Sequence, residues 1–155
     1  NRGIRNTCRT VTDKLETHTR VIEINVVVMY EPKRDFTSLE AWKKARLVKL
    51  FFYKEVVPCL PAEEKFNLNT QIRRASISGT ANISEGYGRY HYQEGIQFYR
   101  VARGSIYELK DHLTSCYDLD FITKEIFDKG LFLIEDAKLT LNGYIKFVNA
   151  RKELE

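Results

Sequence analysis

The sequence predicts an all-α fold, an antiparallel up-down-up-down four-helix bundle that spans residues 35–155. From residue 37 onward, apolar residues recur every three or four positions, which is the spacing of amphipathic helices. The breaks between these periodic segments are short, and short connections place consecutive helices antiparallel. With 155 residues and 43% hydrophobic composition, the chain has the size of one domain with a buried core.

Residues 1–34 are expected to form an N-terminal extension to this bundle. The segment VIEINVVVMYEP alternates Ile22, Ile24, Val26 and Val28 with other residues, which predicts a short β-strand that ends at Pro32. A lone strand is only marginally stable. Three alternatives therefore stay open: the segment docks on the bundle, pairs with another chain, or has no fixed structure.

The first helix is predicted to begin near Thr37 and to end near Val57. Thr37 and Glu40 have the T-x-x-E spacing of a capping box, in which each side chain accepts a hydrogen bond from a backbone donor near the other residue. Pro58 ends the helix because proline lacks the backbone N–H group. The predicted core positions are Ala41, Ala45, Val48, Phe52 and Val56.

The second helix is expected after Pro61, with an interruption at Asn67, and should end near Gly86–Gly88, where a glycine would supply a positive φ. Its buried stripe is narrow, because many of its residues are small: Ala75, Ser76, Ser78, Gly79 and Ala81. Gly79 costs about 1 kcal/mol of helix propensity relative to alanine. Two interpretations remain, namely close packing inside the bundle or a surface that a partner covers.

The third and fourth helices show clear apolar periods. The third is predicted to start near His91, with core residues Tyr92, Ile96, Tyr99, Ala102, Ile106, Leu109, Leu113 and Cys116. The fourth is predicted to start after Thr123, which would cap it, and to end near Ala150, with core residues Ile126, Phe127, Leu131, Ile134, Leu141, Ile145 and Val148.

Residue patterns for catalysis are not found in the sequence. His18, His91 and His112 fall on three different predicted elements, and neither an HExxH motif nor a nucleophile elbow occurs. We therefore expect no enzymatic activity, no cofactor and no metal.

The cysteines and the apolar runs bear on the compartment. The three cysteines, Cys8, Cys59 and Cys116, form no CxxC pair, which argues against a disulfide framework or a zinc site and favours a reducing cytoplasm. The longest apolar run is far shorter than the roughly 20 residues of a membrane span. We expect a cytoplasmic protein without a membrane partner, signal peptide or anchor.

Basic residues cluster in the middle of the chain, although the formal net charge is only +4. One stripe of the third helix carries Arg100, Arg103, Tyr107 and Lys110 at spacings of three and four residues. Cations interleaved with an aromatic ring favour nucleic-acid contact, because cations neutralise phosphates and the ring offers a stacking face. We expect this stripe to lie in register with the basic flank of the second helix.

The remaining candidate cations are Arg73, Arg74 and Arg89. For Arg73 and Arg74, ion pairing inside the bundle or at an oligomer seam and anion binding are equally open. Asn82 lies on the apolar stripe beside Glu85, where an unsatisfied polar group would cost about 1–3 kcal/mol. We therefore predict an internal hydrogen bond for Asn82.

Several motifs resemble one protein family. QIRRASISGTANISEGYGR, then QFYRVARGSIYELKDHL, with FTSLEAWKKARLVKLFFYKEVV and LPAEEKFNL before them, are similar to the 23S rRNA-intervening sequence (S23) proteins over residues 36–150. The resemblance implies a small bacterial four-helix bundle that forms a homo-oligomer, a pentameric ring. It also implies a fold similar to the accessory variability protein of diversity-generating retroelements, which binds nucleic acid and a reverse transcriptase.

The positions that match the family motif are Gln71, Arg73, Arg74, Asn82, Glu85, Gly86, Gly104, Ser105 and Glu108. Two functions are consistent with the sequence. The first is a non-enzymatic, oligomeric protein that binds RNA or DNA through Arg73, Arg74, Arg89, Arg100, Arg103, Tyr107 and Lys110. The alternative is a protein-interaction scaffold or accessory subunit, for example of a reverse transcriptase, with no direct nucleic-acid role.

Overall fold

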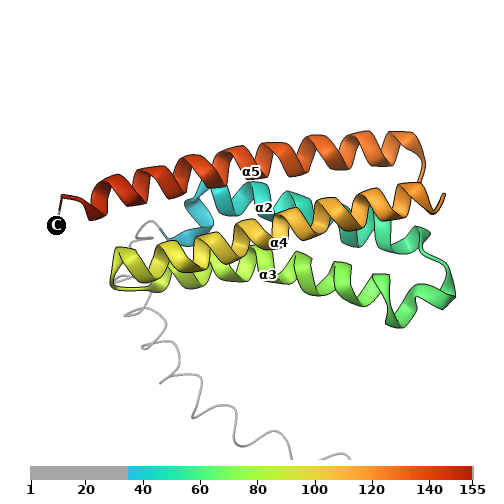
Figure 1. Cartoon of the computed structure of the whole chain (residues 1–155), viewed down its shortest axis with the longest axis horizontal. Helices are drawn as coiled ribbons and strands as arrows, with labels where there is room; N and C mark the ends of the chain where they lie inside the picture. The colour runs from blue at the N-terminus through green and yellow to red at the C-terminus, as the bar shows by residue number, and fades with distance from the viewer. Residues whose placement is uncertain (1–34, 155) are drawn as a thin grey trace, which may run out of the picture. The chain divides into compact units, whose positions relative to one another are not determined.

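The computed structural model describes residues 35–154 of the chain, and this part is built from helices without a β-strand. Its four long helices are α2 (Glu40–Phe51), α3 (Leu68–Gly88), α4 (Tyr92–Asp118) and α5 (Lys124–Lys152) (Figure 1). The predicted all-α class is confirmed. The strand predicted within residues 1–34 lies outside the described residues.

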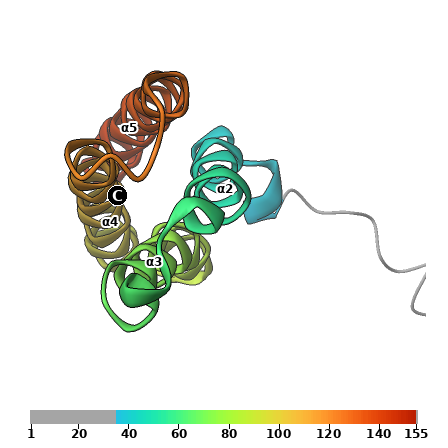
Figure 2. The same cartoon turned by 90° about the vertical axis from the view of Figure 1, so that its right-hand side faces the viewer.

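The four helices form a bundle in which each packs against two neighbours. α2 contacts α3, α3 contacts α4, α4 contacts α5, and α5 closes the ring against α2. The end-on view shows the four helices at the corners of this arrangement, with successive helices side by side (Figure 2). The up-down-up-down bundle is therefore the observed architecture.

The start of the first helix differs from the prediction. The side chain of Asp35 accepts a hydrogen bond from the backbone N–H of Thr37 at 2.8 Å, and a short 3-10 turn, η1 (Phe36–Ser38), precedes α2. The Glu40 carboxylate instead accepts from Lys43 Nζ at 2.7 Å. The predicted capping box is wrong because Asp35 accepts from both the backbone N–H and the hydroxyl of Thr37 and so caps η1, while α2 begins only at Glu40.

Beyond Phe51 the chain remains helical but changes its hydrogen-bond pattern. A π-helical turn, η2 (Phe52–Val56), and a 3-10 turn, η3 (Val57–Cys59), follow α2, so the helical path ends close to Pro58 as predicted. A further 3-10 turn, η4 (Ala62–Phe66), leads to Asn67, whose φ of −112° and ψ of −104° break the helix before α3. The predicted interruption at Asn67 is confirmed.

The backbones of α3 and α4 approach each other closely beside the loop that joins them. A Cβ atom added to Gly86 would lie 2.6 Å from Tyr99 Cε1 and 2.8 Å from the carbonyl oxygen of Gly95. A Cβ atom on Gly95 would lie 2.8 Å from the carbonyl oxygen of Gly86. Only glycine fits at both positions without a shift of the backbone.

This close approach replaces the predicted role of the glycines at the end of α3. Neither Gly86 nor Gly88 has a φ in the left-handed region. The helix ends instead because Arg89 is extended, with a φ of −77° and a ψ of 137°. The expected positive φ is wrong, since α3 can end without a left-handed residue when the next residue is extended.

The predicted core is confirmed along α4 and for the C-terminal part of α5, whereas the predicted Ile126, Phe127 and Leu131 are only half-buried. Seven of the eight predicted α4 residues are buried and the eighth, Tyr92, is half-buried.

Burial raises the pKa of the Cys116 thiol to about 11, so this cysteine stays protonated in the core. Thr123 caps α5 as predicted, since its hydroxyl accepts a hydrogen bond from the N–H of Ile126.

Within residues 35–154, none of the helices combines the length and the apolar content that a membrane span needs.

The two buried glycines of α3 should respond oppositely to alanine. At Gly79 the nearest atom to an added Cβ would be Ile106 Cγ1 at 3.9 Å, an ordinary contact. Gly79→Ala should therefore raise the free energy of unfolding by up to about 1 kcal/mol through helix propensity. Gly86→Ala should lower it by about 1–3 kcal/mol through overpacking. Urea unfolding followed by circular dichroism measures both, and equal stability of Gly86→Ala and the unmodified protein would contradict the close approach.

Candidate nucleic-acid interface

Arg73 connects α3 to the end of the first helical segment. Its Nε donates a hydrogen bond to Asn69 Oδ1 at 2.7 Å, and its guanidinium carbon lies 4.8 Å from the centre of the Tyr53 ring. This cation–π contact orients Arg73 over η2 without neutralising its charge. Arg74 is exposed, and within residues 35–154 it has no hydrogen bond or ion pair.

Beside Arg73, a surface groove runs between α2 and α3. It has a volume of about 310 Å³ and is lined by Lys49, Leu50, Tyr53, Lys54 and Ile77, and we call it the α2–α3 groove. No carboxylate is among its lining residues. Lys49 Nζ donates to Thr80 Oγ1 at 3.3 Å, a neutral partner that leaves the ammonium charge uncompensated.

The sequence analysis missed Lys49, Tyr53 and Lys54 as candidate site residues. Lys49 and Tyr53 are four residues apart and therefore share one side of the helical path, which is the signal that could have identified them. Their proximity to Ile77 and Arg73 depends on how α2 and α3 pack, which helical periodicity does not reveal.

The predicted basic stripe of α4 is divided between solvent and α5. Arg103 Nη1 donates to Asn142 Oδ1 at 3.2 Å, and Lys110 Nζ donates to Glu135 Oε1 at 2.8 Å. The Tyr107 ring lies under Lys138, with Nζ 5.4 Å from the ring centre. Three of the four stripe residues thus contact α5.

The charges in this α4–α5 seam are largely compensated. Hydrogen bonds from Lys110 and Lys138 hold the pKa of the Glu135 carboxyl below its ordinary value. Arg100 is exposed and has no hydrogen bond or ion pair in the described part of the chain. Of the predicted stripe, Arg100 therefore keeps a charge without a partner among residues 35–154. Within the same range Arg103 has only the neutral Asn142 as its partner, whereas Lys110 is paired with Glu135.

The structure does not bring the two predicted basic surfaces into register. Arg73 faces η2 through Tyr53, whereas Arg103 and Lys110 face α5. α3 and α4 are neighbours, but α2 packs beside α3 and α5 packs beside α4 (Figure 2). The register predicted from the sequence is wrong because helical spacing leaves open which neighbour each flank will face.

At the end of α3, Arg89 forms an ion pair with Glu85, one turn earlier in the helix. The Arg89 guanidinium carbon also lies 4.6 Å from the centre of the Phe98 ring of α4. Arg89 is thus held against both helices of the α3–α4 hairpin while it remains exposed to solvent.

The predicted internal hydrogen bond of Asn82 is confirmed. Asn82 Nδ2 donates to the backbone oxygen of Ser78 at 2.9 Å and lies 3.0 Å from Ser78 Oγ. Ser78 Oγ also accepts from Ser105 Oγ at 2.8 Å, so the two serines connect α3 to α4. Asn82 and Ser105 therefore act together in holding the hairpin.

The other motif positions lie on or near the surface. Gln71 is exposed, and Glu108 Oε1 lies 3.6 Å from His112 Nε2. Gly104 is exposed, and a Cβ atom added there would meet nothing within 4 Å. In residues 35–154, His, Cys, Asp and Glu side chains form no group of three that could hold a metal ion.

A comparison with protein-family models matches residues 37–143 of the chain to the family described as 23S rRNA-intervening sequence protein. The match begins at the first turn before α2 and ends within α5, so it contains the α2–α3 groove and the α3–α4 hairpin. A search of curated proteins found no match.

Proposed function

The chain belongs to the 23S rRNA-intervening sequence protein family, and we propose that it is a non-enzymatic, oligomeric protein of the bacterial cytoplasm that binds RNA through the basic surface of α2 and α3. The observation that carries this proposal is the composition of the α2–α3 groove. Two lysines and a tyrosine line it without a carboxylate, and Arg73 lies over the same tyrosine.

Uncompensated cations support RNA binding because each phosphate contact releases condensed counterions from the nucleic acid. Lys54 is exposed and Lys49 has only a hydroxyl partner, so both keep their full charge for this purpose. Arg74 and Arg100 add exposed charge on the neighbouring helix surfaces. Contacts of this kind recognise the phosphate backbone and are independent of base sequence.

The other predicted cations have a smaller part in the proposal. Lys110 is paired with Glu135, and Arg89 is paired with Glu85. An ion pair of this kind must be opened or shared before the cation can meet a phosphate. Because Arg103 contacts Asn142 and Tyr107 contacts Lys138, both on α5, we assign Arg103, Tyr107 and Lys110 mainly to the packing of α4 against α5.

Exposed apolar residues on α5 support the oligomeric part of the proposal. Phe132, Leu139 and Phe147 are 71%, 68% and 53% exposed. Their spacing of seven and eight residues places them on one side of the helix. Large exposed apolar residues on one side of a helix favour an interaction surface, and a second copy of the chain is the partner that a ring-forming family implies. We expect a pentamer.

A protein-interaction scaffold remains the second candidate function. The same α5 face would serve an accessory subunit that binds a different protein. In that case the α2–α3 groove would have no part in binding, and its charges could be reversed without effect.

Reversal of two charges in the groove tests RNA binding. Lys49→Glu with Lys54→Glu should weaken binding of a structured RNA at least 10-fold in about 0.1 M salt, because two phosphate contacts become repulsive. The slope of log affinity against log salt concentration should also fall by about 1–2. Fluorescence anisotropy at a series of salt concentrations measures both quantities.

The matched control is Lys146→Glu with Lys152→Glu, which makes the same charge change at exposed positions of α5. This variant should retain most of the affinity. Equal losses in the two double variants would mean that net charge alone determines binding. An unmodified protein that binds no RNA would leave the scaffold function as the better account.

Assembly can be tested separately from RNA binding. Phe132→Glu with Leu139→Glu should reduce the mass in solution from a multiple of 18.2 kDa to that of one chain, because charges would be buried in the subunit contact. Light scattering coupled to size exclusion gives the mass, and circular dichroism checks that the helices persist. An unchanged multimeric mass would show that this face of α5 is not the subunit contact.

A further inference from the structure

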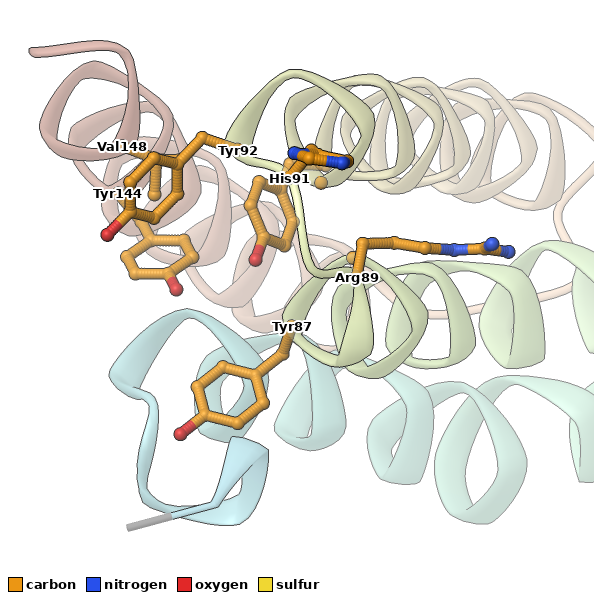
Figure 3. A pocket seen from close by; sticks show the side chains of 9 residues that line it. Tyr87, Arg89, His91, Tyr92, Tyr144 and Val148 are labelled. Carbon is orange, nitrogen blue, oxygen red and sulfur yellow. The ribbon is translucent and has the colours of Figure 1, made fainter. Parts of the chain in front are cut away.

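A pocket with aromatic walls lies at the end of the bundle beside the α3–α4 loop (Figure 3). Its volume is about 120 Å³, and four tyrosines line it: Tyr87 of α3, Tyr92 and Tyr99 of α4, and Tyr144 of α5. Carboxylates are not among the lining residues. The pocket is smaller than the roughly 300–1,000 Å³ of sites that take a drug-sized ligand, so it has room for about one ring.

The innermost walls of the pocket are rigid. The Tyr99 and Tyr144 rings pack edge to face with centroids 5.1 Å apart, and Tyr99 is almost fully buried. The contact between Gly86 and Gly95 places the last turn of α3 directly beside Tyr99. Burial raises the pKa of both phenols, so their hydroxyl groups remain protonated and can donate hydrogen bonds.

The loop beside the pocket carries an open aromatic ring. Tyr90 is 94% exposed, and the His91 ring lies edge-on to it with centroids 5.0 Å apart. An isolated exposed tyrosine is common. Tyr90, however, directly precedes His91 and Tyr92 in the chain, and both of those residues line the pocket. The exposed Tyr90 ring is therefore close to the pocket along the chain.

Arg89 provides the cation of this region. Figure 3 shows its side chain directed away from the tyrosines, and its guanidinium lies over Phe98. Glu85 is paired with the Nη2 atom. A guanidinium has five N–H donors, so donors other than those on Nη2 can still meet a phosphate.

We propose that this end of the bundle binds unpaired nucleotides of RNA, with one base stacked on Tyr90, a neighbouring base in the tyrosine pocket, and the connecting phosphate near Arg89. The inference rests on the proposed RNA-binding function and adds single-stranded segments to its substrates. Paired bases of a duplex are already stacked on each other and present no free face, whereas unpaired bases can turn out onto aromatic side chains.

The test compares a single-stranded RNA of twelve uridines with a blunt RNA duplex of the same length, using fluorescence anisotropy on the full chain. Tyr90→Ala should weaken binding of the single strand by roughly 5- to 150-fold, the usual effect of losing one stacked base. Binding of the duplex should not change. Tyr90→Phe keeps the ring and should bind as the unmodified protein does.

Phe66→Ala is the matched control, because Phe66 is an exposed aromatic residue of η4 that lines neither the tyrosine pocket nor the α2–α3 groove and should not affect either RNA. The salt dependence adds a second readout. Loss of a stacking ring should leave the slope of log affinity against log salt unchanged, whereas loss of a phosphate contact would reduce it. A single strand that contains 2-aminopurine should lose fluorescence on binding to the unmodified protein and to Tyr90→Phe, but less on binding to Tyr90→Ala.

The outcomes separate this inference from the proposed function. If Tyr90→Ala binds the single strand as tightly as the unmodified protein while the Lys49 and Lys54 variant loses affinity, the nucleotide site is wrong and the RNA-binding groove stands. Equal losses for single strand and duplex would also overturn it. If the unmodified protein binds neither RNA, both proposals fail.

Discussion

The contact between the backbones of Gly86 and Gly95 is the constraint on which the rest of the structure depends. It brings the last turn of α3 against the first turn of α4 and fixes their hairpin. Farther along the same pair, the hydrogen bond between Ser105 and Ser78 links the two helices. Because α4 covers this side of α3, α2 packs against another side, where the α2–α3 groove lies.

This arrangement determines which cations are available to a ligand. Residues 36–155 contain 18 basic and 16 acidic residues, so the bundle is nearly neutral and the positions of its charges matter more than their sum. Acidic residues compensate cations along the α4–α5 seam, as Glu135 does for Lys110. The α2–α3 groove has no such residue in its lining. The α2–α3 groove and the α4–α5 seam both carry basic residues, but only the seam has carboxylates that compensate them.

The sequence predicted the helices well because burial imposes a 3.6-residue period, which residues such as Ile106, Leu109 and Leu113 display directly. It also predicted the cap at Thr123, since a cap depends only on its own turn. It failed where a residue outside the recognised motif binds a motif residue, as Asp35 binds Thr37, and where a contact depends on a neighbouring helix. The α2–α3 groove is of the second kind, because Tyr53 and Ile77 meet only after the helices pack.

The most direct test of the account is photochemical cross-linking of bound RNA to the protein, followed by mass spectrometry of the linked peptides. We expect cross-links at Tyr53 in the α2–α3 groove, where Arg73 lies over its ring, and at Tyr90 in the α3–α4 loop. Both rings are placed where RNA would contact them. Cross-links confined to α5, at Phe132 or Phe147, would contradict the account and would assign RNA contact to the face that we propose joins the subunits.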